Sequence, residues 1–340
     1  MTSISVARIH APGEVRLDEV ELPELGPRDI LVKVANCGIC GSDLSYLKLG
    51  GLPGVEMPMP IGHEFAGVIQ QVGKEVTSFA QGNRVVVNPE AVANGIGSTG
   101  NQGAFAPYVL VRNAQADPGA VLRLPEEMNF ETAALIEPLA VGMHGINQAR
   151  VTREDKVAIF GAGPIGLCAA VVAKYYGARD IVVVDLSEKR LAVAEQLGMI
   201  PCKADEVELA SFLKKVHGKV KHLLLGKQVA TDVFIEATGS GPVFQQIIEL
   251  GKHASRAVVI GVHFQPVELN LLKVLTTEMR ITAAYAYPTE FPEVVNMLDS
   301  GDVDVSPLIS HRYPLSQVTE AFEVAQDANS AVKVMVDCQA

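Results

Sequence analysis

Three residues of this 340-residue chain have side chains of the kinds that hold a catalytic zinc ion. Cys40 follows an apolar run, and His63 and Glu64 are neighbours further along the chain. A thiolate, an imidazole and a carboxylate can bind zinc and leave one coordination position open for a reacting molecule. Neighbours in a regular strand point to opposite faces, so His63 and Glu64 can reach one ion only where the chain bends. Pro58 and Pro60, just before them, are consistent with such a bend.

The residues around Cys40 also allow other interpretations. Asp43 suits an indirect role, in which its carboxylate accepts the second N–H of a ligating histidine and fixes the tautomer of the ring. Cys37 and Cys40 form a C-x-x-C pair that could be redox-active. No thioredoxin-like strand–helix–strand context surrounds this pair, and no second pair completes a structural zinc site. Taken singly, a histidine or a cysteine is more often a structural residue than a ligand.

A glycine-rich loop predicts a dinucleotide site. Residues 161–166 (GAGPIG) match G-x-G-x-x-G, follow the apolar run 156–160 and open an alanine-rich helix, which is the context that this motif requires. The glycines allow a tight turn and bring the backbone close to a pyrophosphate, while the start of the helix offers free N–H groups. A proline is tolerated in the first turn of a helix. The candidate contact residues are Gly161, Gly163, Pro164, Ile165 and Gly166.

An acidic residue indicates which dinucleotide binds. Asp185 ends the second apolar strand, 19 residues after Gly166. A carboxylate at this position accepts hydrogen bonds from ribose hydroxyls and repels a 2′-phosphate, so NAD is predicted over NADP. Arg190 could instead meet a phosphate, but we expect Asp185 to dominate the choice. The alternative is an ordinary glycine turn beside a surface aspartate.

The elements that position these residues are of two kinds. Up to about residue 140, short apolar runs such as 29–34, 66–69 and 84–87 are broken by Gly and Pro, which predicts a β-rich module, a partly open barrel or sandwich. From about residue 150, apolar strands alternate with helices. Strands that are apolar throughout are typical of a parallel sheet covered on both faces. The predicted fold class is therefore α/β, a doubly wound parallel sheet joined to a β-rich domain.

Composition excludes several classes of protein. The net charge of −11 argues against a nucleic-acid partner, because phosphate binding needs clustered basic residues. Five scattered cysteines do not make a disulfide framework and fit a reducing compartment. No run reaches the ~18 uncharged apolar residues of a membrane-spanning helix, and the first twelve residues lack the apolar core of a secretory signal. We expect a cytoplasmic protein with no membrane partner.

With both motif sets in view, the chain resembles the zinc-dependent medium-chain dehydrogenases, in the branch of the sorbitol (polyol) and butanediol dehydrogenases. The resemblance spans nearly the whole length: CGSD at 40–43, GHE at 62–64, IEPLAV at 136–141, the glycine loop, EATG at 236–239 and LISHRYPL at 308–315. It implies a GroES-like catalytic domain formed by residues 1–140 and 281–340. It also implies an NAD-binding Rossmann domain formed by residues 141–280.

The resemblance also implies roles for single residues. Cys40, His63 and Glu64 match the zinc positions of the family, and Glu137 matches a carboxylate that approaches the metal directly or through water. Ser42 matches the hydroxyl that takes the proton of a substrate alcohol. The implied reaction is the transfer of a hydride from a secondary alcohol, polyol, sugar acid or vicinal diol to NAD, with zinc as a Lewis acid. Two further cofactor positions are Thr238 and Val262.

Three departures from the family pattern change the expectations. No cysteine lies between residues 88 and 103, where many relatives bind a structural zinc, so we expect one catalytic zinc per chain and no structural zinc. Ser45 stands where a histidine often continues the proton relay, which leaves the relay beyond Ser42 open. Ala286 precedes Tyr287 where sorbitol dehydrogenases have an arginine, so a less hydroxylated substrate, as in butanediol dehydrogenases, becomes an alternative.

Two other functions remain as alternatives. A metal-free quinone or enone reductase of the same superfamily usually lacks the Cys and His ligands and prefers NADPH, which Cys40, His63 and Asp185 argue against. A binding protein that reuses the fold without catalysis would keep the fold but has no need of the ligand set. In relatives the segments equivalent to 258–262 and onward to Arg280 pair the cofactor domains, so a homodimer or homotetramer is expected.

Overall fold

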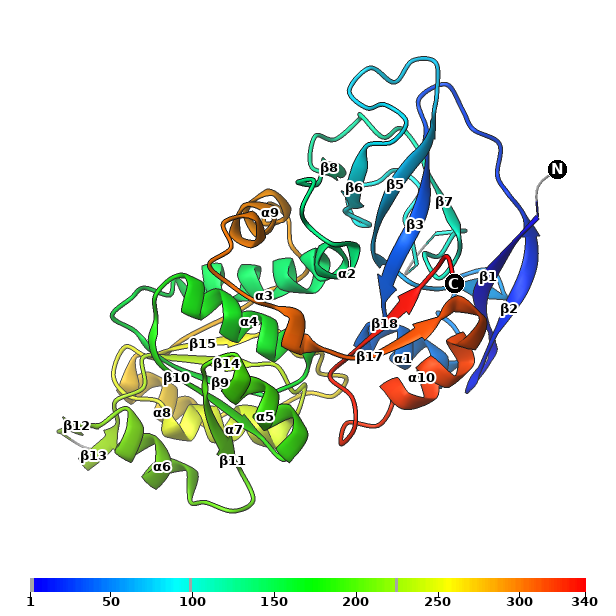
Figure 1. Ribbon diagram of the computed structural model, residues 1–340. Coiled ribbons are helices and arrows are strands. Elements are labelled where there is room, and N and C mark those ends of the chain that lie inside the picture. Colours follow the sequence, from blue (N-terminus) through cyan, green and yellow to red (C-terminus); the bar gives the residue numbers. More distant parts are fainter. Residues whose placement is uncertain (1–2, 98–99, 224–225) are drawn as a thin grey trace. The chain divides into compact units, whose positions relative to one another are not determined.

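The computed structural model describes residues 3–97, 100–223 and 226–340 of the chain, which folds into two compact units (Figure 1). The first unit comprises Met1–Glu137, Phe291–Ser300 and Ile309–Ala340, and the second comprises Pro138–Glu290 and Gly301–Leu308. Both ends of the chain therefore belong to the same unit. Within the described ranges, no helix is both long enough and apolar enough to cross a membrane.

The first unit is built mainly of antiparallel sheet. A seven-stranded sheet has the order β17-β18-β3-β5-β6-β8, with β7 paired to β3, and a three-stranded sheet has the order β2-β1-β4. The strands are β1 (Ser3–Ala11), β2 (Glu14–Glu21), β3 (Ile30–Gly38), β4 (Met59–Pro60), β5 (Glu64–Val72), β6 (Arg84–Val87), β7 (Tyr108–Val111), β8 (Val121–Arg123), β17 (Ile309–Pro314) and β18 (Lys333–Asp337). The helices are α1 (Gly41–Leu49), α2 (Phe130–Ala134), α9 (Phe291–Asp299), α10 (Val318–Ala325) and the 3-10 turn η2 (Leu315–Gln317).

The core of this unit joins the beginning of the chain to its end. Phe65, Phe105 and Phe322 are fully buried, and the rings of Phe105 and Phe322 meet edge to face with centroids 5.5 Å apart. Strand β18, from the last residues of the chain, pairs antiparallel with β3. The predicted β-rich module is confirmed, and its sheet is completed by a strand from the C-terminal segment.

The second unit is a six-stranded, all-parallel sheet in the order β11-β10-β9-β14-β15-β16. Its strands are β9 (Lys156–Phe160), β10 (Arg179–Asp185), β11 (Ile200–Lys203), β14 (Val233–Glu236), β15 (Arg256–Val259) and β16 (Arg280–Ala283). A separate antiparallel pair is formed by β12 (Lys219–His222) and β13 (Gly226–Val229). The helices are α3 (Ile136–Ala149), which contains the boundary between the units, α4 (Pro164–Tyr175), α5 (Glu188–Gln196), α6 (Leu209–Val216), α7 (Gly241–Leu250), α8 (Leu271–Thr277) and the 3-10 turn η1 (Ser306–Leu308).

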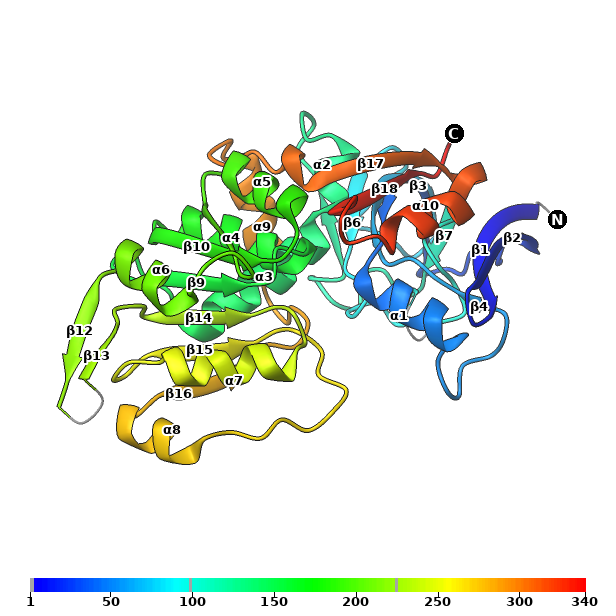
Figure 2. The same ribbon diagram turned by 90° about the horizontal axis from the view of Figure 1, so that it is seen from below.

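The central strands of the parallel sheet are buried on both faces. In β9 the residues from Val157 to Phe160 are buried, and in β14 every residue is. Figure 2 shows β9, β10, β14 and β15 running side by side. Such strands are apolar throughout because helices cover both faces of the sheet. The predicted doubly wound parallel sheet is confirmed. Glu236 is the polar exception at the end of β14.

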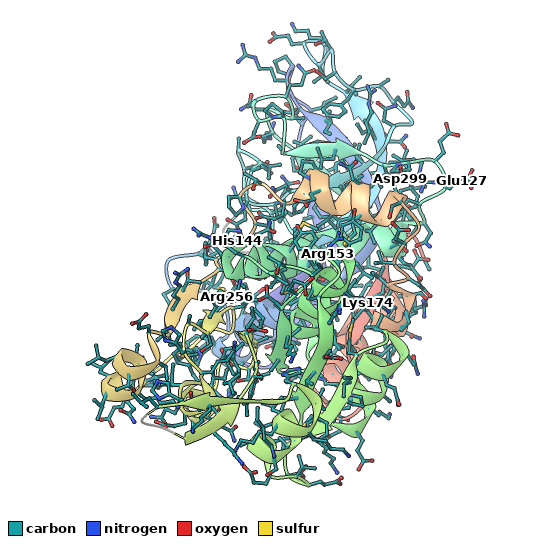
Figure 3. The ribbon with its side chains drawn as sticks, turned by 90° about the vertical axis from the view of Figure 1, so that its left-hand side faces the viewer. Glu127, His144, Arg153, Lys174, Arg256 and Asp299 are labelled. Carbon is teal, nitrogen blue, oxygen red and sulfur yellow. The ribbon has the colours of Figure 1, made fainter. Side chains whose placement is uncertain are left out.

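Helix α3 is held at its C-terminal end by a residue from β15. Arg256 donates hydrogen bonds to the carbonyls of Ala149 (2.9 Å) and Arg150 (2.8 Å) and forms an ion pair with Asp155. A cation at a helix C-terminus stabilises the helix dipole. On the same helix, the Nδ1 of His144 lies 2.7 Å from a carboxylate oxygen of Glu290. Figure 3 labels Arg256 and His144 near this helix.

His217, directly after α6, is a buried histidine outside the predicted site. Its Nδ1 lies 2.8 Å from the Thr231 hydroxyl and its Nε2 lies 2.6 Å from the carbonyl oxygen of Asp180. A carbonyl only accepts, so Nε2 carries the proton and Nδ1 accepts from Thr231. Burial lowers the pKa of His217 below its ordinary value. The unfolded chain therefore binds a proton at this residue more readily than the folded chain does.

This lowered pKa predicts an acid-sensitive contribution to stability. The contribution is complete above the unfolded pKa of ~6.5 and is lost as the pH falls toward the folded value, at up to about 1.4 kcal/mol per pH unit. We expect His217→Gln to lower the free energy of unfolding at pH 7.5 but to flatten its decline between pH 6.5 and 5.5. Urea unfolding of both proteins at several pH values measures this. Parallel declines in wild type and variant would contradict the assignment.

Candidate metal centre and dinucleotide loop

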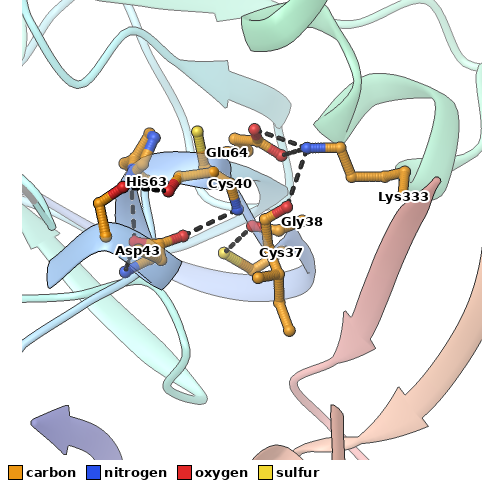
Figure 4. A network of polar contacts seen from close by, with 11 residues as sticks. Cys37, Gly38, Cys40, Asp43, His63, Glu64 and Lys333 are labelled. Carbon is orange, nitrogen blue, oxygen red and sulfur yellow. Dashed lines mark hydrogen bonds and ion pairs between the residues drawn. The ribbon is translucent and has the colours of Figure 1, made fainter. Parts of the chain in front are cut away.

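The first unit brings together three ligand types in one place. Ligand atoms of Cys40, His63 and Glu64 all lie within 4.8 Å of one another (Figure 4). Glu64 is fully buried and His63 nearly so, while Cys40 is half-buried. The three candidate ligands predicted from their residue types are therefore neighbours in space, although the first two lie 23 residues apart in the sequence.

Two glycines make room for this arrangement. Gly62 has φ +97°, and a Cβ there would lie 2.8 Å from the Phe105 backbone nitrogen, so only glycine fits. The bend that lets His63 and Glu64 face the same site is thus at Gly62 itself, two residues before the start of β5. Gly38 pairs with Glu64 at the end of β3, and a Cβ on Gly38 would lie 2.3 Å from the Glu64 Oε2. The close approach of Phe105 therefore requires glycine at 62, and the close approach of the Glu64 carboxylate requires glycine at 38.

Asp43 fixes the two loops that carry the ligands. This fully buried carboxylate accepts hydrogen bonds from the backbone N–H of Cys40 (2.9 Å) and of Gly62 (3.3 Å). Its Oδ1 lies 3.5 Å from the His63 Nδ1, longer than an ordinary hydrogen bond. Burial alone would lower the pKa of His63, but the Asp43 carboxylate and the Cys40 sulfur together raise the pKa well above its ordinary value. The predicted hydrogen bond from the His63 ring to Asp43 is not formed at this distance, so the indirect role of Asp43 stays a prediction.

Lys333 is a functional neighbour that sequence reasoning missed. Its Nζ lies 2.7 Å and 2.6 Å from the two carboxylate oxygens of Glu64 and donates to the carbonyl of Ile39 at 3.0 Å. Both side chains of this ion pair are buried, with 2% and 0% exposure. Lys333 begins β18, 269 residues after Glu64. The available signal was a lysine within the otherwise apolar run 331–336, because a lysine is almost never fully buried unless it is paired.

Ser42 and Glu137 differ in how they relate to the cluster. Ser42 lies in the first turn of α1, directly after Cys40, and its Oγ is buried without a hydrogen-bond partner among the described residues. A buried hydroxyl with no partner costs free energy unless a bound molecule forms a hydrogen bond with it. Glu137 is buried in α3 and does not belong to the group of clustered ligand atoms. Its approach to the metal stays a prediction.

The donor set fits zinc. One sulfur, one ring nitrogen and a carboxylate are the ligand types of zinc sites that leave a position open. The buried Nδ1 of His63 has no hydrogen-bond partner among the residues that the structure describes, so the ring lacks the full set of partners that a purely structural histidine would have. The Cys40, His63 and Glu64 side chains would hold the ion.

The predicted glycine loop has the backbone that the motif requires. Gly161 has φ +101°, and a Cβ on Gly166 would lie 1.9 Å from the carbonyl oxygen of Gly161. Gly163 is the N-cap of α4, and Pro164 opens the helix. Nothing lies closer than 3.8 Å to a Cβ built on Gly163, where the nearest atom is Nη1 of Arg190. The start of α4 therefore offers backbone N–H groups beside open space, as phosphate binding needs.

Asp185 lies at the carboxyl end of β10, next to this loop. Its Oδ2 accepts from the backbone N–H of Ala162 at 2.6 Å, and its Oδ1 accepts from those of Leu186 and Ser187 at 2.7 and 2.8 Å. These bonds hold the carboxylate in place at the edge of the sheet where parallel-sheet proteins bind nucleotides.

Strand β14, which lies on the other side of β9 from β10, is followed by a turn that hydrogen bonds also fix. The buried Glu236 carboxylate accepts from the backbone N–H of Thr238 (2.7 Å) and of Gly239 (2.9 Å), and it pairs with His263 at 2.9 Å. These bonds fix the predicted cofactor residue Thr238. Val262, the other predicted contact on this side, is 69% exposed. Glu236 belongs to the EATG motif, but its role in positioning Thr238 was not predicted from the sequence.

Comparisons with known proteins agree with both parts of the site. Residues 26–125 match the family model of the alcohol dehydrogenase GroES-like domain, and residues 164–300 match that of the zinc-binding dehydrogenases. Sorbitol dehydrogenase from Rattus norvegicus is 35% identical over 346 residues, covering 97% of this chain and 94% of the rat protein.

Solved structures share the whole fold. The 2R,3R-butanediol dehydrogenase from Bacillus subtilis superposes with a TM-score of 0.87 at 29% identity, covering 98% of this chain and 99% of that chain. A protein from Sinorhizobium meliloti 1021, solved as a zinc-binding dehydrogenase bound to NADP, has a TM-score of 0.86 at 26% identity, covering 99% of this chain and 100% of that chain. Since a neighbour of this similarity is described with NADP, the fold alone does not choose the dinucleotide.

Proposed function

The chain belongs to the zinc-dependent medium-chain dehydrogenases, in the branch of the sorbitol and butanediol dehydrogenases, and from this premise we propose that it oxidises a secondary alcohol of a polyol, vicinal diol or sugar acid with NAD. The observation that carries the proposal is the cluster of Cys40, His63 and Glu64, together with the buried hydroxyl of Ser42, two residues after Cys40, which has no hydrogen-bond partner among the described residues. The enzyme is an oxidoreductase, with one catalytic zinc and no structural zinc proposed per chain. A cytoplasmic location is proposed with it.

Different residues of the chain have different roles in this reaction. When bound, zinc supplies Lewis-acid polarisation of the substrate oxygen, which makes the hydroxyl more acidic. Ser42 would accept a hydrogen bond from that hydroxyl, because the Ser42 Oγ has no other partner among the described residues, and the proton that the alcohol loses ends in water. Asp43 keeps the Cys40 and Gly62 loops at a fixed separation. The alcohol loses a hydride and a proton, and the dinucleotide gains the hydride.

The substrate class follows from what this chain lacks. Ala286, with φ +53°, stands where the polyol-specific relatives are expected to have an arginine, and Tyr287 after it is buried. Without the guanidinium, fewer substrate hydroxyls can be bound by charged donors. The proposal therefore favours a vicinal diol or a short polyol over a long one.

The test is NAD reduction by the purified protein with secondary alcohols, vicinal diols, polyols and sugar acids, with and without a chelator. We expect turnover of one class, and its loss after zinc removal and recovery after zinc is added back. Chelator-insensitive turnover of quinones with NADPH would instead support a metal-free reductase. Bound zinc and NAD without turnover of any class would support a binding protein.

The preference for NAD is proposed to depend on Asp185. Asp185→Ser removes the charge that repels a 2′-phosphate, and the guanidinium of Arg190, which lies beside Gly163, can then attract one. We expect the ratio of kcat/KM for NADP to that for NAD to rise about 10- to 100-fold, since a hydrogen bond to a charged group is worth about 1.5–3 kcal/mol. Steady-state kinetics with both dinucleotides measures this ratio. Adding Arg190→Ala should reverse most of the gain, and an unchanged ratio in the single variant would refute the role of Asp185.

A homodimer or homotetramer is proposed through the free edge of the parallel sheet. Strand β16 is the last strand of the sheet, and edge strands present unpaired backbone groups. Close to it in the sequence, α8 exposes Leu271, Leu272 and Leu275 by 68% or more. Exposed apolar side chains that gather in one region mark association surfaces. A second copy placed against β16 and α8 would cover them.

A further inference from the structure

The β12–β13 hairpin is a feature that the proposed reaction does not use. Its strands pair antiparallel, with Lys221 directly opposite Lys227 and Lys219 opposite Val229. In Figures 1 and 2 the pair lies at the outer end of the second unit, beyond the parallel sheet. A hairpin of two four-residue strands is marginal in water unless other contacts hold it. Its conformation therefore needs anchoring contacts.

One face of the hairpin supplies those contacts. The Gln228 side chain donates to the carbonyl of Gly251 at 3.1 Å, and the His222 Nε2 lies 3.2 Å from the carbonyl of Thr276 in α8. Gln228 is buried, and Val220 on the same face is half-buried. The hairpin is thereby fixed to the unit at α8, so its other face is presented outward in a defined orientation.

The other face carries three lysines, which we call the basic strip, and Val229, which is buried at the base of the hairpin opposite Lys219. Lys219, Lys221 and Lys227 are exposed, and none of them forms an ion pair with any described residue. Like charges directly opposite across two strands are destabilising. An anionic surface placed against these lysines would offset the repulsion between Lys221 and Lys227.

The charge of the strip differs from that of the rest of the chain. Between Leu209 and Thr231 the sequence has five lysines and no acidic residue, whereas the whole chain has a net charge of −11. The residues outside this segment therefore carry −16. A second copy, with its net negative charge, is therefore attracted to this segment.

The basic strip also adjoins apolar surface. Leu223, directly after β12, is 94% exposed, and the hairpin is bonded to α8, whose three exposed leucines belong to the proposed association surface. A nucleic acid or an anionic lipid would have to approach a chain that is otherwise strongly acidic. A second copy can offer acidic side chains that pair with the lysines and an apolar surface that covers Leu223.

We propose that the β12–β13 hairpin is a docking arm that holds a second copy of this chain, with its lysines on acidic side chains of the partner and Leu223 in apolar contact. The inference rests on the association through β16 and α8 proposed above. It adds that the arm, rather than the sheet edge alone, sets the strength of the assembly and makes it depend on salt.

The test compares four variants by mass photometry and sedimentation at 50 mM and 1 M salt. Lys221→Glu places opposite charges across the hairpin, so it cannot weaken the hairpin itself. Lys74→Glu, an exposed lysine of the first unit, is the matched control with the same change in charge. Leu223→Asp tests the apolar contact, and Leu275→Asp tests the association surface of α8.

We expect Lys221→Glu to weaken the dimer about tenfold at low salt and far less at 1 M, Leu223→Asp to weaken it at both, and Lys74→Glu to leave it unchanged. A monomeric wild type would refute the association and the arm together. If Leu275→Asp gives monomers while Lys221→Glu and Leu223→Asp assemble like wild type, the association stands and the arm is refuted. Loss of binding to phosphatidylserine vesicles by Lys221→Glu, with assembly unchanged, would make the arm a lipid contact and overturn the proposal.

Discussion

Replacing Cys40 with serine is expected to remove zinc from the protein and to lower kcat/KM for the alcohol by about a thousandfold or more. The cluster offers three candidate ligands among the described residues, and the thiolate is the softest of them, whereas a serine hydroxyl keeps its proton at neutral pH and binds zinc poorly. A thousandfold change corresponds to about 4 kcal/mol, which is within the contribution of a Lewis acid to a developing alkoxide charge. The measurements are zinc per chain by plasma mass spectrometry and steady-state kinetics.

Cys202→Ser is the matched control for this variant. Cys202 is a buried thiol in β11 of the parallel sheet, where the environment raises its pKa to about 11 through burial, so it stays protonated and acts only in packing. We expect this control to keep its zinc and its turnover and to lose only stability. A Cys40→Ser protein that retains one zinc per chain and its turnover would place the metal elsewhere and disprove the cluster as the catalytic centre.

The parts of this site that the sequence could predict are those encoded locally. Residue type and context identified Cys40, His63 and Glu64, because a thiol, an imidazole and a carboxylate next to turn residues are a recognisable zinc ligand set. The glycine loop and Asp185 lie within one strand–helix–strand unit, so their spacing in the sequence was enough to predict that they are close in space. The parallel order of the sheet followed from the apolar strands alternating with helices.

What the sequence could not give depends on long-range pairing. The bend before Glu64 was expected from two prolines, yet the conformation that only glycine allows is at Gly62, and the reason is the approach of Phe105 from a distant loop. Lys333 reaches Glu64 because β18 pairs with β3, a register that no local pattern encodes. The orientation of the β12–β13 hairpin also depends on distant residues, since its anchoring face contacts Gly251 and Thr276.

Lys333→Met is expected to cause the largest loss of stability among the variants considered, and the loss should depend on zinc. The substitution keeps the length of the side chain but leaves the fully buried Glu64 carboxylate without its cation. Breaking a buried ion pair by removing one partner costs about 3–5 kcal/mol, because the remaining charge is desolvated and unpaired. Urea unfolding of the zinc-free protein should show this difference from wild type.

Zinc and the double variant separate the charge of Lys333 from its packing. Zinc placed at the cluster supplies a second cation to Glu64, so added zinc should raise the stability of Lys333→Met by more than it raises that of wild type. Glu64→Gln together with Lys333→Met removes both charges and should recover most of the stability of the zinc-free protein while losing zinc affinity. A zinc-free Lys333→Met protein within about 1 kcal/mol of wild type would show that Glu64 does not need the lysine. In that case Lys333 only fills space in β18, and Glu64 is available to the metal without competition.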